Sequence, residues 1–189
     1  MSVIRIGNCL PESIAAGALA AVPPLSWPFW HRYTGRNGDK YGTVDACRLP
    51  ANVHLALNTL ALSLGAYLPA GAFWDMDLHG AGIHVLPPGG FLERHLDAKR
   101  HPIHGWTRTT SAVLFLTSHP DGSGALVLEQ SKQVIVPEFN TAVIFDTEEE
   151  WHWVRKTVGT RITLALFGWR PGKDGDGTTM AAEFVPAGE

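Results

Sequence analysis

The sequence predicts a single α+β domain that is mainly β, with helices first and an antiparallel sandwich or barrel after them. Three observations predict it. The 189 residues amount to one domain. Helical patterns are confined to the N-terminal part, over residues 11–22 and 51–68. After Pro69 the chain becomes a series of short apolar runs separated by turn residues. Helices that precede a run of strands favour an arrangement in which the helices buttress one sheet.

The first predicted helix covers residues 11–22, because Pro11 followed by Glu12 is typical of a helix start. The run 14–22 also has the apolar character of a short signal peptide, and Arg5 precedes it. Since Pro11 and Glu12 separate Arg5 from that run, we expect a packed helix instead. Residues 23–50 are expected to be rich in loops.

The second predicted helix, residues 51–68, reads ANVHLALNTLALSLGAYL and contains mostly strong helix formers with leucines at near-helical spacing. The strands are expected where apolar runs alternate with Gly- and Pro-containing turns. These runs are Ile83–Leu86, Ala112–Leu116, Ala125–Leu128, Gln133–Val136, Ala142–Phe145 and Ile162–Phe167.

The composition is that of a globular protein, with 45% hydrophobic and 17% charged residues. The net charge of -3 and the lack of a long basic run give no reason to expect a nucleic-acid partner. No stretch approaches the ~20 apolar residues that cross a membrane, so no membrane partner is expected. Cys9 and Cys47 form no CxxC, which fits a reducing cytoplasm, although one disulfide between them is an alternative. The oligomeric state is not determined.

A candidate metal site begins with the H-x-D of His95 and Asp97, whose side chains would point to the same side of a strand. Such a pair alone is not specific, because it also occurs by chance and on surface turns. His152 lies more than 50 residues downstream, at a place where an antiparallel barrel can return to the first pair. Two His and one carboxylate form the facial triad of non-haem iron oxygenases, which leaves positions open for a cosubstrate and for oxygen.

Arg161 follows His152 by nine residues and begins an apolar strand. A guanidinium that points into a barrel requires an anion, because burying it unpaired is costly. A carboxylate that accepts two hydrogen bonds is its natural partner, and a structural salt bridge is the alternative.

The order of these blocks resembles the iron(II)/2-oxoglutarate oxygenases of the prolyl 4-hydroxylase-like branch. The resemblance covers residues 82–170, about half of the chain, and residues 1–81 give no independent match. It is carried by the strand, Pro-Gly turn and H-x-D of Gly82–Asp97, the Arg, small hydroxyl residue and apolar strand of Arg108–Leu116, the turn Ser123–Leu126, the strand Val136–Phe145 and the final block His152–Trp169.

The resemblance implies a double-stranded β-helix, or jelly roll, over residues 82–170, with a helical and loop layer in 1–81 and a tail in 171–189. It implies Fe(II) held by His95, Asp97 and His152, and O2 and 2-oxoglutarate consumed with release of succinate and carbon dioxide. Arg161 would bind the distal carboxylate of 2-oxoglutarate, with Ser111 as a further cofactor-binding residue. Arg108 and Trp106 are expected to contact the substrate.

The sequence departs from this family at Leu86, where members often have a Tyr that touches 2-oxoglutarate. His84 lies two residues earlier and should face the same way. We therefore expect His84 to supply the missing polar contact, with an inward core histidine as the alternative. Asp97 is kept, and since halogenating relatives replace this carboxylate with a small residue, hydroxylation is favoured.

Three functions are compatible with the sequence. The first is hydroxylation of a small molecule or amino-acid-like substrate, and the second is hydroxylation of a peptidyl residue of prolyl type. The third is a cupin-type metal protein that does not use 2-oxoglutarate, which Arg161 disfavours. The substrate pocket is expected to involve the loop Lys99–Arg108 and the aromatic segment Trp27–Tyr33. If residues 98–107 act as a lid, a small molecule is favoured.

Overall fold

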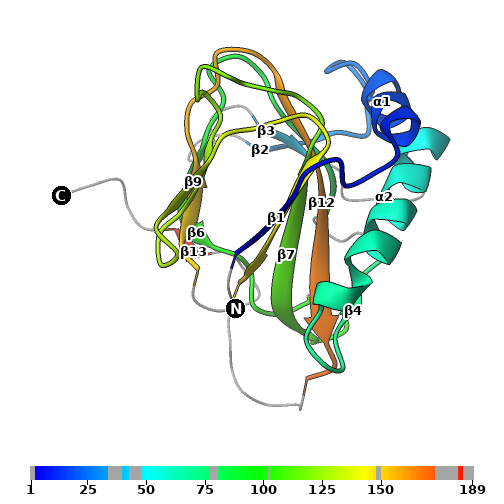
Figure 1. Cartoon of the computed structure of the whole chain (residues 1–189), viewed down its shortest axis with the longest axis vertical. Coiled ribbons are helices and arrows are strands. Elements are labelled where there is room, and N and C mark those ends of the chain that lie inside the picture. Colours follow the sequence, from blue (N-terminus) through cyan, green and yellow to red (C-terminus); the bar gives the residue numbers. More distant parts are fainter. Residues whose placement is uncertain are drawn as a thin grey trace.

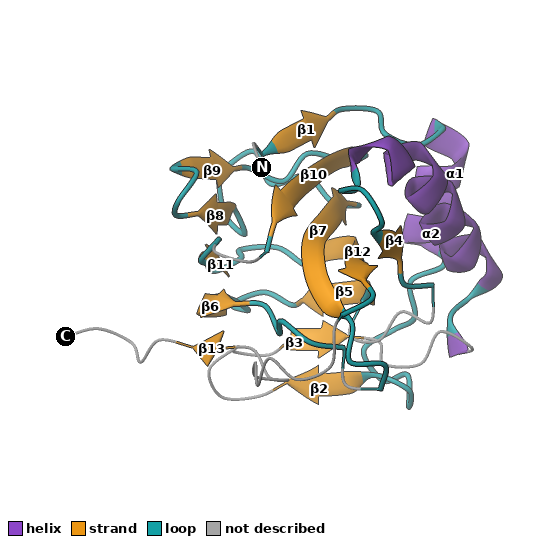
Figure 2. Cartoon of the chain, turned by 90° about the horizontal axis from the view of Figure 1, so that it is seen from below, coloured by secondary structure: helices purple, strands orange, loops and turns teal. Residues whose placement is uncertain are grey.

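The computed structural model of the chain describes residues 3–33, 40–42, 48–76, 81–101, 103–147, 150–172 and 183–184. In these residues the protein is a jelly roll of two antiparallel sheets, with two helices packed on the outside of the larger sheet (Figures 1 and 2). Both helices lie before residue 65, as expected, and the strands of residues 82–170 follow them.

The larger sheet contains eight strands within the described residues, in the order β1-β10-β7-β12-β5-β3-β2, with β4 paired to β12. Its strands are β1 (Ile4–Ile6), β10 (Thr141–Asp146), β7 (Thr107–Phe115), β12 (Arg161–Arg170), β5 (Gly82–Leu86), β3 (Lys40–Gly42), β2 (His31–Tyr33) and β4 (Phe73–Trp74). The smaller sheet has the order β13-β6-β11-β8-β9. Its strands are β13 (Glu183–Phe184), β6 (Leu92–Leu96), β11 (His152–Val154), β8 (Leu126–Leu128) and β9 (Gln133–Ile135).

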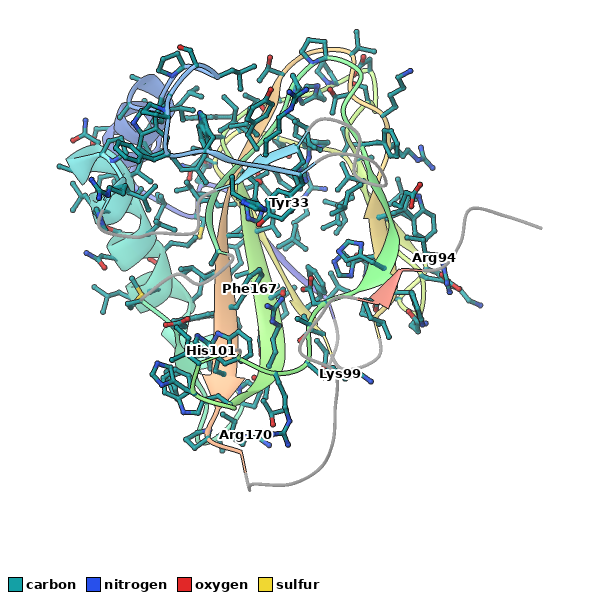
Figure 3. The ribbon with its side chains drawn as sticks, turned by 180° about the vertical axis from the view of Figure 1, so that it is seen from behind. Tyr33, Arg94, Lys99, His101, Phe167 and Arg170 are labelled. Carbon is teal, nitrogen blue, oxygen red and sulfur yellow. The ribbon has the colours of Figure 1, made fainter. Side chains whose placement is uncertain are left out.

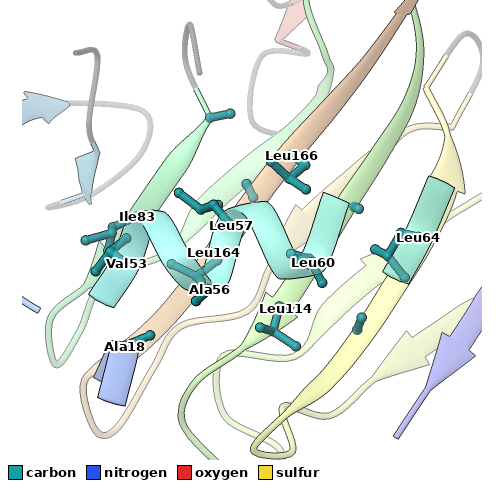
Figure 4. Packing of buried hydrophobic residues seen from close by; sticks show 14 of the residues in the cluster. Ala18, Val53, Ala56, Leu57, Leu60, Leu64, Ile83, Leu114, Leu164 and Leu166 are labelled. Atoms are coloured by element: carbon teal, nitrogen blue, oxygen red, sulfur yellow. The ribbon is translucent and has the colours of Figure 1, made fainter. Parts of the chain in front are cut away.

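The helices α1 (Glu12–Ala20) and α2 (Ala51–Leu64) pack against each other and cover the outer face of the larger sheet. A short 3-10 turn, η2 (Gly65–Tyr67), extends α2. The inner face of α2 presents fully buried apolar residues at helical spacing, which lie over the aliphatic side chains of β5, β7 and β12 (Figure 4). They are Val53, Ala56, Leu57, Leu60 and Leu64. Burial of these apolar side chains stabilises the outer face of the larger sheet against the helices. The inner face of the sheet is therefore available to line a cavity.

The strand β12 divides its side chains between these two faces. Leu164 and Leu166 belong to the core under the helices. The alternate residues Arg161, Thr163 and Phe167 line a cavity between the two sheets. Successive side chains of a strand point to opposite faces of the sheet. The same strand therefore contributes alternate residues to the packed core and to the cavity.

Both predicted helices are confirmed, and so are the six predicted strand regions, which differ from the observed strands mainly at their ends. The expectation of loops in 23–50 was wrong in part, because β2 and β3 extend the edge of the larger sheet. Such short strands carry little signal of their own, and here β3 is stabilised by pairing with β5 and β2 by pairing with β3. Cys9 has a free thiol, and Cys47 lies outside the described residues. None of the described helices has the length and apolarity that crossing a membrane requires.

Candidate metal and cosubstrate site

His95, Asp97 and His152 converge on one point in the described structure. His95 on β6 is the direct antiparallel partner of His152 on β11, and Asp97 follows the end of β6. The ligand atoms of the three residues lie within 4.8 Å of one another. Asp97 Oδ1 lies 3.7 Å from His95 Nε2 and 3.7 Å from His152 Nε2. The arrangement could therefore hold one metal ion from one side.

Both imidazoles are held in the tautomer that a metal requires. The Nδ1 of His95 lies 2.7 Å from the carbonyl oxygen of Glu93, and the Nδ1 of His152 lies 3.0 Å from that of Glu150. A carbonyl only accepts, so Nδ1 carries the proton and donates it, and Nε2 keeps its lone pair for a metal. Burial and the neighbouring His152 lower the pKa of His95 to about 3, so this ring stays neutral.

Asp97 is oriented by two donors on its second oxygen. Ser111 donates a hydrogen bond of 2.8 Å to Oδ2, and Arg108 Nη1 lies 3.2 Å from the same atom. Burial alone would raise the pKa of Asp97, but Arg108, the two histidines and the Ser111 hydrogen bond hold it well below its usual range. The carboxylate is thus ionised, with Oδ1 left to face the histidines.

Arg108 reaches the site because β7 contains a bulge. In the pairing of β7 with β12, Gly168 lies opposite Thr110 and the next residue, Trp169, lies opposite Arg108, so that Thr109 is skipped. Strict alternation from the inward Ser111 would point Arg108 outward, and the extra residue reverses this. The guanidinium lies over the rings of Phe167, at 3.7 Å, and Trp169, at 4.8 Å.

Arg161 lies on the inner face at the start of β12 and is 4% exposed. Its guanidinium lies 5.2 Å from the ring centroid of Phe115, and within the described residues its Nε has no hydrogen-bond partner and the side chain has no ion pair. Burial lowers the pKa of Arg161 to about 9. A buried cation with free donors is costly unless an anion joins it, so Arg161 fits the binding of a carboxylate.

These residues surround a cavity of about 250 Å³ between the sheets. His84 and Leu86 both line it, as the alternation along β5 predicts. Ser111 also lines it and donates its hydroxyl to Asp97, so it orients the metal ligand, and its expected contact with the cosubstrate stays a prediction. Arg108 also lines the cavity and pairs with Asp97, and its expected contact with the substrate stays a prediction.

Lys40 lines this cavity and was not predicted from the sequence, whereas Tyr33, which also lines it, belongs to the aromatic segment predicted to form the pocket. Both lie on the β2–β3 pair, in the segment interpreted as loops, so no alternation pattern was available to assign their side chains to a face. Tyr33 is the only residue of the predicted pocket segment Trp27–Tyr33 among those lining the cavity in the described structure. Trp27 contacts Phe29 and Trp30 edge to face instead.

The structure does not bring Trp106 to the cavity, which contradicts its expected contact with the substrate. Trp106 packs edge to face on Phe73, with ring centroids 4.7 Å apart, and stacks on His104 at 4.1 Å. Its loop folds back on itself, because the buried His101 binds Asp75 at 3.1 Å and accepts hydrogen bonds from the backbone of residues 103 and 104. His101 lies near the Arg170 end of β12, beyond Phe167 (Figure 3). His101 thus holds this turn against Asp75, and the role of residues 98–107 as a lid stays a prediction.

Comparison with known proteins agrees with this geometry. Residues 81–169 match the family model described as "2OG-Fe(II) oxygenase superfamily". No curated protein sequence matches the chain significantly.

Among solved structures, a prolyl-4-hydroxylase from Pseudomonas putida has a TM-score of 0.63 and 22% identity, over 91% of this chain and 93% of that one. A Trichoplax adhaerens prolyl hydroxylase in complex with a hypoxia inducible factor peptide fragment has a TM-score of 0.61 and 17% identity, over 89% of this chain and 82% of that one. The non-heme alpha-ketoglutarate-dependent epimerase SnoN from nogalamycin biosynthesis has a TM-score of 0.64 and 14% identity, over 100% of this chain and 91% of that one.

The structural similarities establish the fold, and the family model accounts for the segment that carries the triad and Arg161. The match over residues 81–169 thus supports an iron(II)- and 2-oxoglutarate-dependent oxygenase of the 2OG-Fe(II) oxygenase superfamily.

Proposed function

We propose that this enzyme hydroxylates a small molecule or an amino-acid-like substrate. The observation that carries the proposal is the cavity of about 250 Å³, which joins the His-Asp-His triad to Arg161, a cation without an ion pair in the described part of the chain. A bound 2-oxoglutarate would occupy much of that volume. What remains suits a group of a few heavy atoms next to the metal.

In this proposal His95, Asp97 and His152 hold Fe(II), and three observations support the fit. The two Nε2 atoms and Oδ1 face one point, both Nδ1 protons are donated to carbonyls, and the ionised Asp97 supplies a compensating charge. The bound iron would activate O2 and 2-oxoglutarate. Because Asp97 is a carboxylate, no ligand position is open to a halide, which favours hydroxylation.

The chain's own residues would position the reactants and exclude water. Arg161 would bind the distal carboxylate of 2-oxoglutarate through its free donors while Phe115 supports the guanidinium from beneath. Leu86, Val113 and Phe145 provide apolar walls around it. Because these apolar side chains exclude water, electrostatic interactions inside the cavity are stronger than in solvent.

His84 is proposed to supply the polar contact that Leu86 lacks. It lies on the inner face of β5, opposite Thr163 of β12, and the ring is confined by Gly42, where an added Cβ would lie 3.3 Å from His84 Cδ2. Replacing His84 with Ala should weaken 2-oxoglutarate binding and leave iron binding intact. Unchanged affinity for both would instead assign His84 to the packing of the wall.

The second candidate function is hydroxylation of a peptidyl residue of prolyl type. It is favoured by the shared fold of the Trichoplax adhaerens enzyme, whose structure contains a peptide fragment. The two functions differ in the substrate that stimulates succinate release. A panel of free amino acids and small carboxylic acids, compared with proline-containing peptides, would separate them.

The decisive first experiment is an anaerobic titration with Fe(II) and then 2-oxoglutarate, followed by the visible metal-to-ligand band. The wild-type protein should develop the band, Asp97→Ala should not, and Arg161→Met should require much more 2-oxoglutarate. A wild type without the band, or a band indifferent to Arg161→Met, would favour a cupin-type protein that does not use 2-oxoglutarate.

A further inference from the structure

Lys40 occupies a defined place on the cavity wall. The pairs Tyr41 with Val85 and Gly42 with His84 put Lys40 beside Leu86, the residue at the end of β5. Leu86 in turn pairs with Arg161 on β12. Lys40, Leu86 and Arg161 therefore form a row across three neighbouring strands, and all three side chains line the cavity.

The ammonium group of Lys40 has an aromatic neighbour but no carboxylate of its own. It lies 4.9 Å from the ring centroid of Tyr33, its partner across the β2–β3 pair. No ion pair joins it to a carboxylate in the described part of the chain. Burial lowers the pKa of Lys40 to about 8; the charge of Asp97 opposes this shift, and the charges of Arg161 and Arg108 add to it. A lysine kept in such surroundings would gain strongly from an added anion.

A count of charges indicates which anion is missing. Among the described residues that line the cavity, the cations are Lys40, Arg108 and Arg161, and the one carboxylate is that of Asp97. Arg108 is already paired with Asp97. Of the two carboxylates of 2-oxoglutarate, one would meet Arg161 and the other the metal. Lys40 is then the one cation of this set that still lacks an anionic partner.

The geometry points to a primary substrate that carries a carboxylate, which Lys40 binds at the cavity wall while Tyr33 confines the ammonium group. The inference rests on the proposed function and narrows its substrate to small carboxylic acids, amino acids included. A carboxylate fits better than a phosphate group, because a single lysine in a cavity of about 250 Å³ cannot satisfy the many acceptors of a phosphate.

Acetate can serve as the probe, with acetamide as its uncharged match. Mn(II) replaces Fe(II) in the 2-oxoglutarate complex, and the relaxation of the methyl protons of each probe reports its binding near the paramagnetic ion. Wild type should show a saturable effect with acetate and a much smaller one with acetamide. Lys40→Met should weaken the acetate effect about ten-fold or more, and Lys40→Arg should largely retain it. Lys156→Met is the matched control, since this exposed lysine does not line the cavity.

Three results would overturn the inference, as would the absence of any acetate effect in a wild type that binds 2-oxoglutarate. The first is an equal relaxation effect on the methyl protons of acetate and of acetamide with the wild-type protein, a comparison that requires no variant. The second is an acetate effect that survives Lys40→Met. The third is a loss of 2-oxoglutarate affinity in Lys40→Met with thermal unfolding unchanged, because Lys40 would then bind the cosubstrate. A wild type that shows no 2-oxoglutarate band refutes the proposed function itself, whereas a band without an acetate effect refutes only the substrate class.

Discussion

Arg108 Nη1 lies 3.2 Å from Oδ2 of Asp97, on the side of the carboxylate that faces away from the two histidines. This contact, together with the Ser111 hydrogen bond, leaves Oδ1 as the oxygen directed at the metal position. Arg108 therefore acts on the metal site through Asp97, as a positioning residue.

Arg108→Met should lower the affinity for Mn(II) or Fe(II) about 10- to 100-fold, because the orientation of a ligating carboxylate depends on its outer hydrogen bonds. Arg108→Lys should not restore it, since lysine lacks the planar guanidinium that stacks on Phe167. The measurement is a metal titration at fixed pH. Arg170→Met, at the exposed end of β12, is the control and should bind metal as wild type does. If Arg108→Met and Arg170→Met bind metal with equal affinity, Ser111 alone orients Asp97.

Asp97→Ala should abolish metal binding and also destabilise the ligand-free protein. Its removal leaves the buried Arg108 without its anion, and an uncompensated buried charge costs about 3 kcal/mol. Urea unfolding of the metal-free protein would measure this. The double variant with Arg108→Met should recover most of the lost stability without recovering metal binding; no recovery would mean that Arg108 is not the source of the cost.

Substitutions at Gly124 and Gly122 form a matched pair that tests whether the turn positions the side chain of Arg161. Both have positive φ, +63° and +77°, but a Cβ at Gly124 would lie 2.9 Å from Arg161 Cδ, whereas one at Gly122 would meet nothing within 4 Å. Either change to Ala should cost about 1 kcal/mol of stability through backbone strain. Only Gly124→Ala should also weaken 2-oxoglutarate binding, by displacing Arg161. Equal 2-oxoglutarate affinities in the two variants would contradict this role for the turn.

Arg161→Met should not destabilise the ligand-free protein and should raise or preserve its Tm, because it removes a buried cation without a partner in the described structure and keeps the packing on Phe115. The rise in Tm that 2-oxoglutarate produces in the Mn(II)-loaded wild type should disappear in the variant. Thermal unfolding with and without 2-oxoglutarate checks both statements. A large loss of stability without ligand would mean that Arg161 is chiefly a structural residue.

The binding of acetate should depend on pH through Lys40. Its pKa is lowered to about 8, so the cation is present below this pH and is lost as the pH rises through it. The affinity for acetate should fall about ten-fold per pH unit above about 8 in the wild type. Lys40→Arg should bind acetate with a flat profile over the same range, because arginine stays protonated. The other charged and titratable groups around the cavity that holds Lys40 are Tyr33, His84, His95, Asp97, Arg108, His152 and Arg161. A wild-type profile as flat as that of Lys40→Arg would exclude Lys40 as the anion-binding group.

Local sequence patterns determined a large part of this protein. The apolar spacing of residues 51–68 predicted α2 and its buried face, since helical periodicity is set within one segment. The alternation in β5 correctly directed both His84 and Leu86 into the cavity. The spacing of His95 and Asp97, with His152 and Arg161 further along, predicted the residues that the fold brings around one cavity.

Only the tertiary structure decided the parts that depend on distant pairing. The direction of Arg108 follows from a bulge that exists because Gly168 and Trp169 pair with β7 about 60 residues away. Lys40 enters the cavity because β3 is stabilised by β5, a contact that its three residues do not encode. Trp106 lies away from the cavity because it packs on His101, which is held in place by its hydrogen bond with Asp75. Side-chain direction within a long regular element is a local property, whereas bulges, edge strands and pinned turns are stabilised by partners far along the chain.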